Sequence, residues 1–173
     1  YFITYSQLVP FEINNKPNHP IIILVSYMCD PSCSKEARKM CLDFFIRVTD
    51  QRQNPFKADK VSQIAATIPL DDPESIVSFS QLCYNLQIKL HVDLSPIIPT
   101  LVHFCTYDLM STIDIHNFLL VFIYNEVTFS SYMSNFFVPL FDGLDSQKIV
   151  NLFNKYNELY TLFTHFFGGH LSE

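Results

Sequence analysis

The sequence predicts an all-α protein of seven to eight helices, and three observations support this fold class. Only three glycines occur in 173 residues, Gly143, Gly168 and Gly169, whereas sheet proteins rely on glycine at hairpin turns and bulges. An Asp or Ser precedes a proline at three positions, which is typical of a helix start because proline lacks the N–H that would be unpaired there. Apolar residues also recur every three or four positions, which is the period of an α-helix.

Four helices are expected in the first half of the chain. Pro20 opens the first, because its ring presets the helical φ angle. Ser32 and Ser34 are alternative N-caps for the second helix, and Asp72 is the expected N-cap of the fourth. The apolar stripes that predict the second, third and fourth helices are Ala37, Met40, Cys41, Phe44, Phe45 and Val48 within 34–50; Val61, Ile64, Ala65 and Ile68; and Ile76, Phe79, Cys83, Leu86 and Leu90 within 73–90.

The second half of the chain is apolar on nearly all faces up to residue 141. The run Phe118–Tyr124 predicts a helix in the centre of the core, although its β-branched and aromatic residues would also suit a buried strand. The apolar stripe Ile149–Phe167 predicts one helix of about five turns, with Gly168 and Gly169 as its left-handed stop. The helices expected before it span residues 96–110, 113–127 and 130–141, the last capped by Ser130.

These helices are expected to form a single domain over residues 20–173, preceded by an extended lead-in over residues 1–19. The sequence has no evident repeat of fixed period, but successive helices fall into loose antiparallel pairs. Two architectures fit. One is an irregular α-solenoid fragment similar to armadillo and HEAT repeats, and the other is a globular bundle around the apolar helix Phe118–Tyr124.

Charge and composition exclude several classes of function. The net charge is −6 and the 11 Lys and Arg residues are scattered, so we expect no direct binding to nucleic acid, which needs a concentrated basic face. The glycines cannot form a phosphate-binding loop. The longest apolar run, Phe118–Tyr124, is too short for a transmembrane segment. Five cysteines with irregular spacing and the lack of an N-x-S/T site indicate reduced thiols in an intracellular compartment, cytoplasm or nucleus.

No pattern of catalytic or metal-binding residues emerges. Cys29, Cys33 and Cys41 lack the second pair of ligands that a structural zinc site needs. His103 and Cys105 are two residues apart, so on a helix they point away from each other. We therefore predict no catalytic residue, no metal, no cofactor and no enzymatic activity.

Apolar residues are instead in excess. The chain has 17 Phe and 9 Tyr, and only 16% of its residues are charged, so part of the apolar surface is expected to contact a protein partner. Leu162, Phe166 and Leu171 are the predicted partner-binding residues. Because the chain begins at Tyr1, we expect a domain of a larger protein. The predicted function is a non-enzymatic scaffold or interaction domain that binds a partner segment in an apolar groove between helices, within a hetero-complex.

Two alternative functions stay open at this point. In size, helix count and central apolar helix the chain is similar to Bcl-2-like regulators, which implies binding of an amphipathic helix, although the Asn-Trp-Gly-Arg motif of that family is absent. The aromatic content would also suit a helical domain with an apolar pocket for a lipid or isoprenoid, although Asp-rich magnesium motifs are absent.

Overall fold

The computed structural model describes residues 20–51, 58–107 and 116–168. These segments contain ten α-helices and no strand, which confirms the all-α prediction, although the expected number of helices was seven to eight. The expected lead-in 1–19 lies outside the described segments. A π-helical turn, Asn85–Lys89, continues α4, and a 3₁₀ turn, Ser95–Ile97, precedes α5. The helices are α1 Pro20–Met28, α2 Lys35–Asp50, α3 Ala58–Thr67, α4 Pro73–Tyr84, α5 Ile98–Tyr107, α6 His116–Tyr124, α7 Glu126–Ser130, α8 Met133–Asp142, α9 Ser146–Lys155 and α10 Asn157–Phe167.

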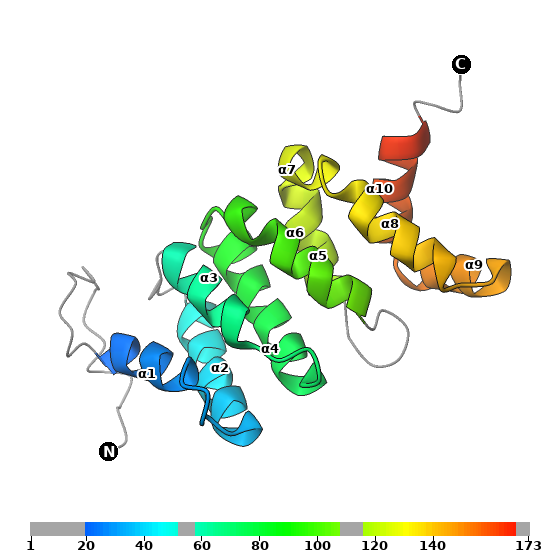
Figure 1. Ribbon diagram of the computed structural model, residues 1–173. Helices are drawn as coiled ribbons and strands as arrows, with labels where there is room; N and C mark the ends of the chain where they lie inside the picture. The colour runs from blue at the N-terminus through cyan, green and yellow to red at the C-terminus, as the bar shows by residue number, and fades with distance from the viewer. Residues whose placement is uncertain (1–19, 52–57, 108–115, 169–173) are drawn as a thin grey trace.

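The helices are stacked in two rows from the N-terminal to the C-terminal end of the molecule (Figure 1). In one row α2 packs against α4, α4 against α6, and α6 against α10. In the other row α1 packs against α3, α3 against the 3₁₀ turn before α5, and α5 against α8. Because α6 is one member of a row and not the axis of a bundle, the arrangement is that of an irregular α-solenoid.

A repeat that the sequence does not reveal appears in the contacts along the row α2–α4–α6. Hydrogen bonds that join α2 to α4 and its π-helical turn connect residues 34 to 39 positions apart. Those that join α4 and the π-helical turn to α6 connect residues 36 and 38 positions apart. Neighbouring helices of this row therefore run parallel at a nearly constant offset, and the structural unit is one pair of helices.

Phenylalanine supplies the largest side chains of the core. The largest fully buried side chains include Phe45, Phe79, Phe118, Phe122, Phe129, Phe136 and Phe137. The predicted core helix is confirmed as α6, in which Phe118, Leu119, Val121 and Phe122 are buried. Its last two residues, Ile123 and Tyr124, are exposed, so the apolar run extends beyond the buried part of the helix. No helix in the described segments combines the length and the apolar character that a membrane crossing needs.

The predicted helix starts in the first half of the chain are confirmed. Ser34 caps α2 by accepting a hydrogen bond from the Ala37 N–H, and Asp72 caps α4 by accepting one from the Ser75 N–H. Ser32 is not the cap, because its hydroxyl and N–H bind the Asp30 carboxylate instead. Side-chain caps are local interactions, which is why a single sequence predicts them well.

The prediction for the C-terminal part is wrong in three respects. The single helix expected over 149–167 breaks at Tyr156 into α9 and α10. The break lets Phe153 pack against Phe163, whereas a continuous helix would hold these rings about three turns apart. Gly168 has φ −65° and is not a left-handed stop, and Gly169 lies outside the described residues. Ser130 is the last residue of α7 and does not cap α8. Three short helices, α6, α7 and α8, lie where two were expected, and the breaks between them fall at Asn125 and Tyr132.

Candidate partner-binding groove

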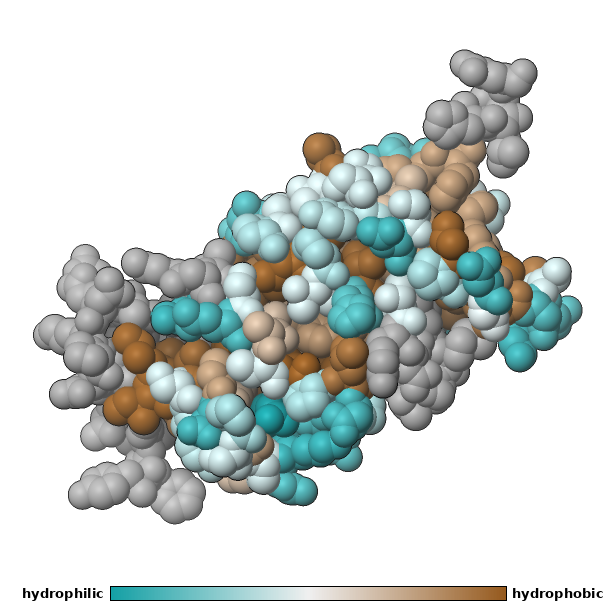
Figure 2. Space-filling model, in the orientation of Figure 1, coloured by the Kyte–Doolittle hydropathy of each residue, from teal (hydrophilic) through white to brown (hydrophobic). Residues whose placement is uncertain are grey.

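A groove lies where α2 and α4 begin. These parallel helices start at the same end of the molecule, and the space between their first turns has a volume of about 410 Å³. Hydrophilic side chains gather at this end, at the lower edge of the view in Figure 2. We call this space the α2–α4 groove; its lining consists of Lys35, Glu36, Lys39, Met40 and Asp43 from α2 and residues 71–74 from the start of α4.

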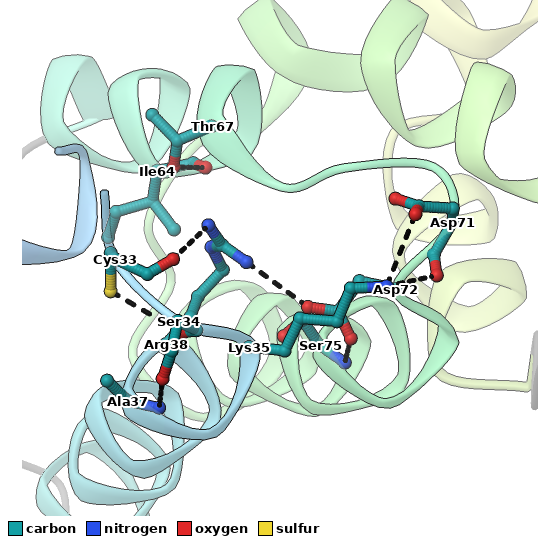
Figure 3. A network of polar contacts seen from close by, with 10 residues as sticks. All are labelled: Cys33, Ser34, Lys35, Ala37, Arg38, Ile64, Thr67, Asp71, Asp72 and Ser75. Atoms are coloured by element: carbon teal, nitrogen blue, oxygen red, sulfur yellow. Dashed lines mark hydrogen bonds and ion pairs between the residues drawn. The ribbon is translucent and has the colours of Figure 1, made fainter. Parts of the chain in front are cut away.

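A buried ion pair holds the two helix starts together beneath the groove. The side chains of Arg38 and Asp72 are 6% and 5% exposed, and Arg38 Nη1 donates to Asp72 Oδ2 over 3.2 Å. Arg38 Nη2 donates to the Cys33 carbonyl, and the other Asp72 oxygen accepts the Ser75 N–H (Figure 3). The Asp72 carboxylate thus caps α4 and also neutralises the Arg38 guanidinium of α2. Breaking such a desolvated pair leaves an uncompensated charge, so the offset between α2 and α4 is strongly specified.

Two exposed lysines of the groove are also paired. Lys35 Nζ reaches from α2 to the start of α4, where it lies 2.9 Å from the Asp71 carbonyl and 3.2 Å from Asp71 Oδ2 (Figure 3). Lys39 Nζ lies 2.9 Å from Asp43 Oδ2, and this hydrogen bond raises the pKa of Lys39. Exposed pairs of this kind stabilise the fold little, but they neutralise the cations of the groove.

Two carboxylates of the groove have no opposite charge within ion-pair distance in the described part of the chain, Glu36 on α2 and Glu74 on α4. Hydrogen bonds from its own backbone N–H and from the Ser34 hydroxyl lower the pKa of Glu36, so it is charged at neutral pH. Both residues lie in the first turn of a helix, where the helix dipole favours a negative charge.

Met40 adds an apolar group to this charged lining. Its side chain lines the groove and is 72% exposed. The apolar stripe of the sequence had assigned Met40 to the buried face of α2, and the structure corrects this assignment: the buried face is centred on Cys41, Leu42, Phe45 and Val48. The groove therefore combines an accessible, adaptable apolar side chain with a carboxylate on each wall.

A second, smaller groove of about 220 Å³ lies between α5 and the start of α8. Its lining is Pro99, Val102, His103, Thr106, Tyr132 and Asn135. None of these is a large apolar side chain that is exposed to solvent, so this groove offers less apolar surface to a partner than the α2–α4 groove does.

Two of the three predicted partner-binding residues, Leu162 and Phe166, lie on α10, at the other end of the molecule (Figure 1). Leu162 is 4% exposed and belongs to the protein's own core, so it is not available to a partner in this structure. Phe166 is half-buried, with its ring centroid 6.2 Å from that of Phe129. Leu171 lies outside the described residues. The sequence alone did not point to Glu36, Met40 and Glu74 as site residues. It does show two N-capped helix starts, each with an acidic residue in the first turn, and this pattern could have indicated Glu36 and Glu74.

The buried thiols are unsuited to nucleophilic chemistry. Burial raises the pKa of Cys83 and Cys105 well above the usual range, which keeps both sulfur atoms protonated, whereas a nucleophilic cysteine needs its thiolate form. Within residues 20–51, 58–107 and 116–168 no group of three or more His, Cys, Asp or Glu side chains is placed to hold a metal ion.

The fold and the groove define the class of protein as an all-α chain of stacked helices with a mixed apolar and acidic groove. No model of a protein family, no curated protein and no solved structure matches this chain. Function must therefore be inferred from the geometry and chemistry of the groove itself.

Proposed function

We propose that this chain is a non-enzymatic interaction domain, part of a scaffold in a larger protein, and that it binds a segment of a partner protein in the α2–α4 groove. The observation that carries the proposal is the position of Met40, a large apolar side chain that is 72% exposed and lines a groove of about 410 Å³.

The rigidity of the groove walls supports this proposal. Arg38 and Asp72 are both buried and fix the start of α4 against α2, and Ser34 and Asp72 cap the two helices. A site that is already ordered loses little conformational entropy when a partner binds. The partner then gains the burial of the methionine side chain, about 1.5–3 kcal/mol when it is complete.

We place the domain in the cytoplasm or nucleus, within a hetero-complex. Cys29, Cys33, Cys41, Cys83 and Cys105 are all free thiols, and reducing compartments keep thiols in this form. The net charge of −6 disfavours nucleic acid as the partner.

Selection from a random peptide library would test the proposal. Peptides selected on the wild-type protein are expected to bind Met40→Gln about tenfold more weakly, because the variant keeps the length of the side chain and loses its apolar end. The matched control is Val127→Thr on α7, since Val127 is 88% exposed and lies away from the groove. Binding measured by surface plasmon resonance should be unchanged in the control. Binders that lose no affinity in Met40→Gln, or a selection that yields no binder, would contradict the proposed function.

A further inference from the structure

The charges of the α2–α4 groove do not balance. The three cations that line or underlie it are each in an ion pair with an aspartate: Lys35 with Asp71, Arg38 with Asp72 and Lys39 with Asp43. Two further carboxylates, Glu36 and Glu74, line the same groove and have no such partner in the described segments. The groove therefore presents two negative charges that an occupant can neutralise.

The two unbalanced carboxylates lie on opposite walls. Glu36 belongs to α2, and Glu74 belongs to the first turn of α4. Met40 follows Glu36 by four residues, so the two side chains lie on the same face of α2, one turn apart. The site thus offers an apolar contact with a negative charge on either wall.

On the basis of the proposed function, we propose that the partner segment in the α2–α4 groove is a basic amphipathic helix. Its apolar side chains pack on Met40, and lysine or arginine side chains on either side of them pair with Glu36 and Glu74. Methionine suits this role because its unbranched side chain adapts to different apolar partners. Complementary charge sets the orientation of the segment and speeds its association, and the net charge of −6 adds attraction at longer range.

Helix docking fits this site better than the other common modes of peptide recognition. Addition of a β-strand needs an open sheet edge, and the described part of the chain contains no strand. Recognition of a polyproline helix needs a groove lined by aromatic rings, and none of the residues that line this groove is aromatic. A helix satisfies its own backbone hydrogen bonds, so it can dock through side chains alone.

The test uses three short synthetic amphipathic peptides that share one leucine face and differ in the polar face, which is lysine, glutamine or glutamate. Fluorescence anisotropy gives the dissociation constant of each at about 50 mM salt, where exposed charges act over a long range. The groove variant is Glu36→Gln with Glu74→Gln. The matched control is Asp93→Asn with Asp142→Asn, which changes the net charge equally at two exposed carboxylates that lie outside the groove lining and, like Glu36 and Glu74, are in no ion pair within the described segments.

The leucine–lysine peptide is expected to bind the wild-type protein most tightly. The groove variant should weaken its binding about threefold to tenfold, as expected for two exposed ion pairs. The control variant should change it by less than about twofold, and the difference between the two variants should shrink at about 0.5 M salt. Thermal unfolding of both variants near the wild-type temperature confirms that neither substitution unfolds the protein.

Each contrary outcome has a distinct meaning. If the glutamine or glutamate peptide binds as tightly as the lysine peptide, and Met40→Gln weakens that binding, the inference of a basic partner is overturned while the groove function stands. Equal losses in the groove and control variants would show that the whole acidic chain attracts the peptide, which also overturns the inference. If Met40→Gln leaves the binding of all three peptides unchanged, both the inference of a basic partner and the proposed function of the groove are contradicted.

Discussion

The N-terminal region, α1–α6, and the C-terminal region, α7–α10, are held together by different interactions. In the N-terminal region, buried polar contacts join neighbouring helices of one row, as in Arg38–Asp72 and Thr49–Asn85. In the C-terminal region, aromatic rings make the corresponding contacts. The ring pairs between α8 and α10 are Phe137–Phe163, Phe137–Phe167 and Phe141–Phe163.

This difference shows how one chain sets helix positions in two ways. Hydrogen bonds have narrow limits of distance and angle, so a buried polar contact fixes the offset between two helices. Apolar burial is not directional, so rings tolerate small shifts of one helix on another. Among the described residues, two pairs of histidine with glutamate near the surface, His116–Glu158 and His165–Glu126, link α10 to α6 and α7. The α2–α4 groove lies in the N-terminal region, where buried hydrogen bonds define the helix positions more narrowly.

The largest effect is expected from Asp72→Ala. This substitution removes the buried partner of Arg38, which costs about 3–5 kcal/mol, and also the N-cap of α4, which costs about 1 kcal/mol more. The control is Asp71→Ala, which breaks the exposed pair with Lys35 and is expected to cost no more than about 1 kcal/mol. Urea unfolding measures the free energy of unfolding of both variants. Equal stability of the two variants would show that the buried pair does not hold α4 in place.

A somewhat smaller effect is expected from Phe137→Ala in the C-terminal region. Phe137 is almost fully buried and packs against four other rings, so its loss should cost about 3–5 kcal/mol through the cavity it leaves. Phe137→Leu keeps much of the volume and should cost less than about 1.5 kcal/mol. If leucine is as damaging as alanine, the ring geometry itself is specific, and aromatic packing fixes helix positions as strictly as the buried polar contacts do.

The smallest of the three effects is expected from Gln87→Met. The Oε1 atom of Gln87 accepts hydrogen bonds from the Leu94 N–H and the Asn125 side chain. Methionine has a similar shape and leaves these buried donors without their partner, which should cost about 1–3 kcal/mol. Gln147→Met serves as the control, because Gln147 is exposed on α9 and its side-chain hydrogen bond, to Asn151, stays within that helix. Hydrogen exchange of the Leu94 amide should accelerate in the first variant, and unchanged exchange would count against this contact as a tie between α4 and α6.

Sequence reasoning worked where the cause of a structure is local. The period of apolar residues and the caps Ser34 and Asp72 act within one or two turns, so the helices of the first half were predicted nearly to their ends. It failed at Tyr156, where packing of Phe153 on Phe163 ends a helix that the apolar pattern would continue. It also misplaced Met40 and Leu162, because an apolar stripe does not state which of its edge residues face the core.

The sequence by itself determined that this protein is helical, because few glycines, proline at helix starts and the apolar period all act through neighbouring residues. Only the tertiary structure decided the two rows, the offset between parallel helices and the groove. Arg38 and Asp72 are 34 residues apart, and nothing in their local sequence marks them as partners. Long-range contacts of this kind depend on which helices pack together, and this choice is made by the whole core at once.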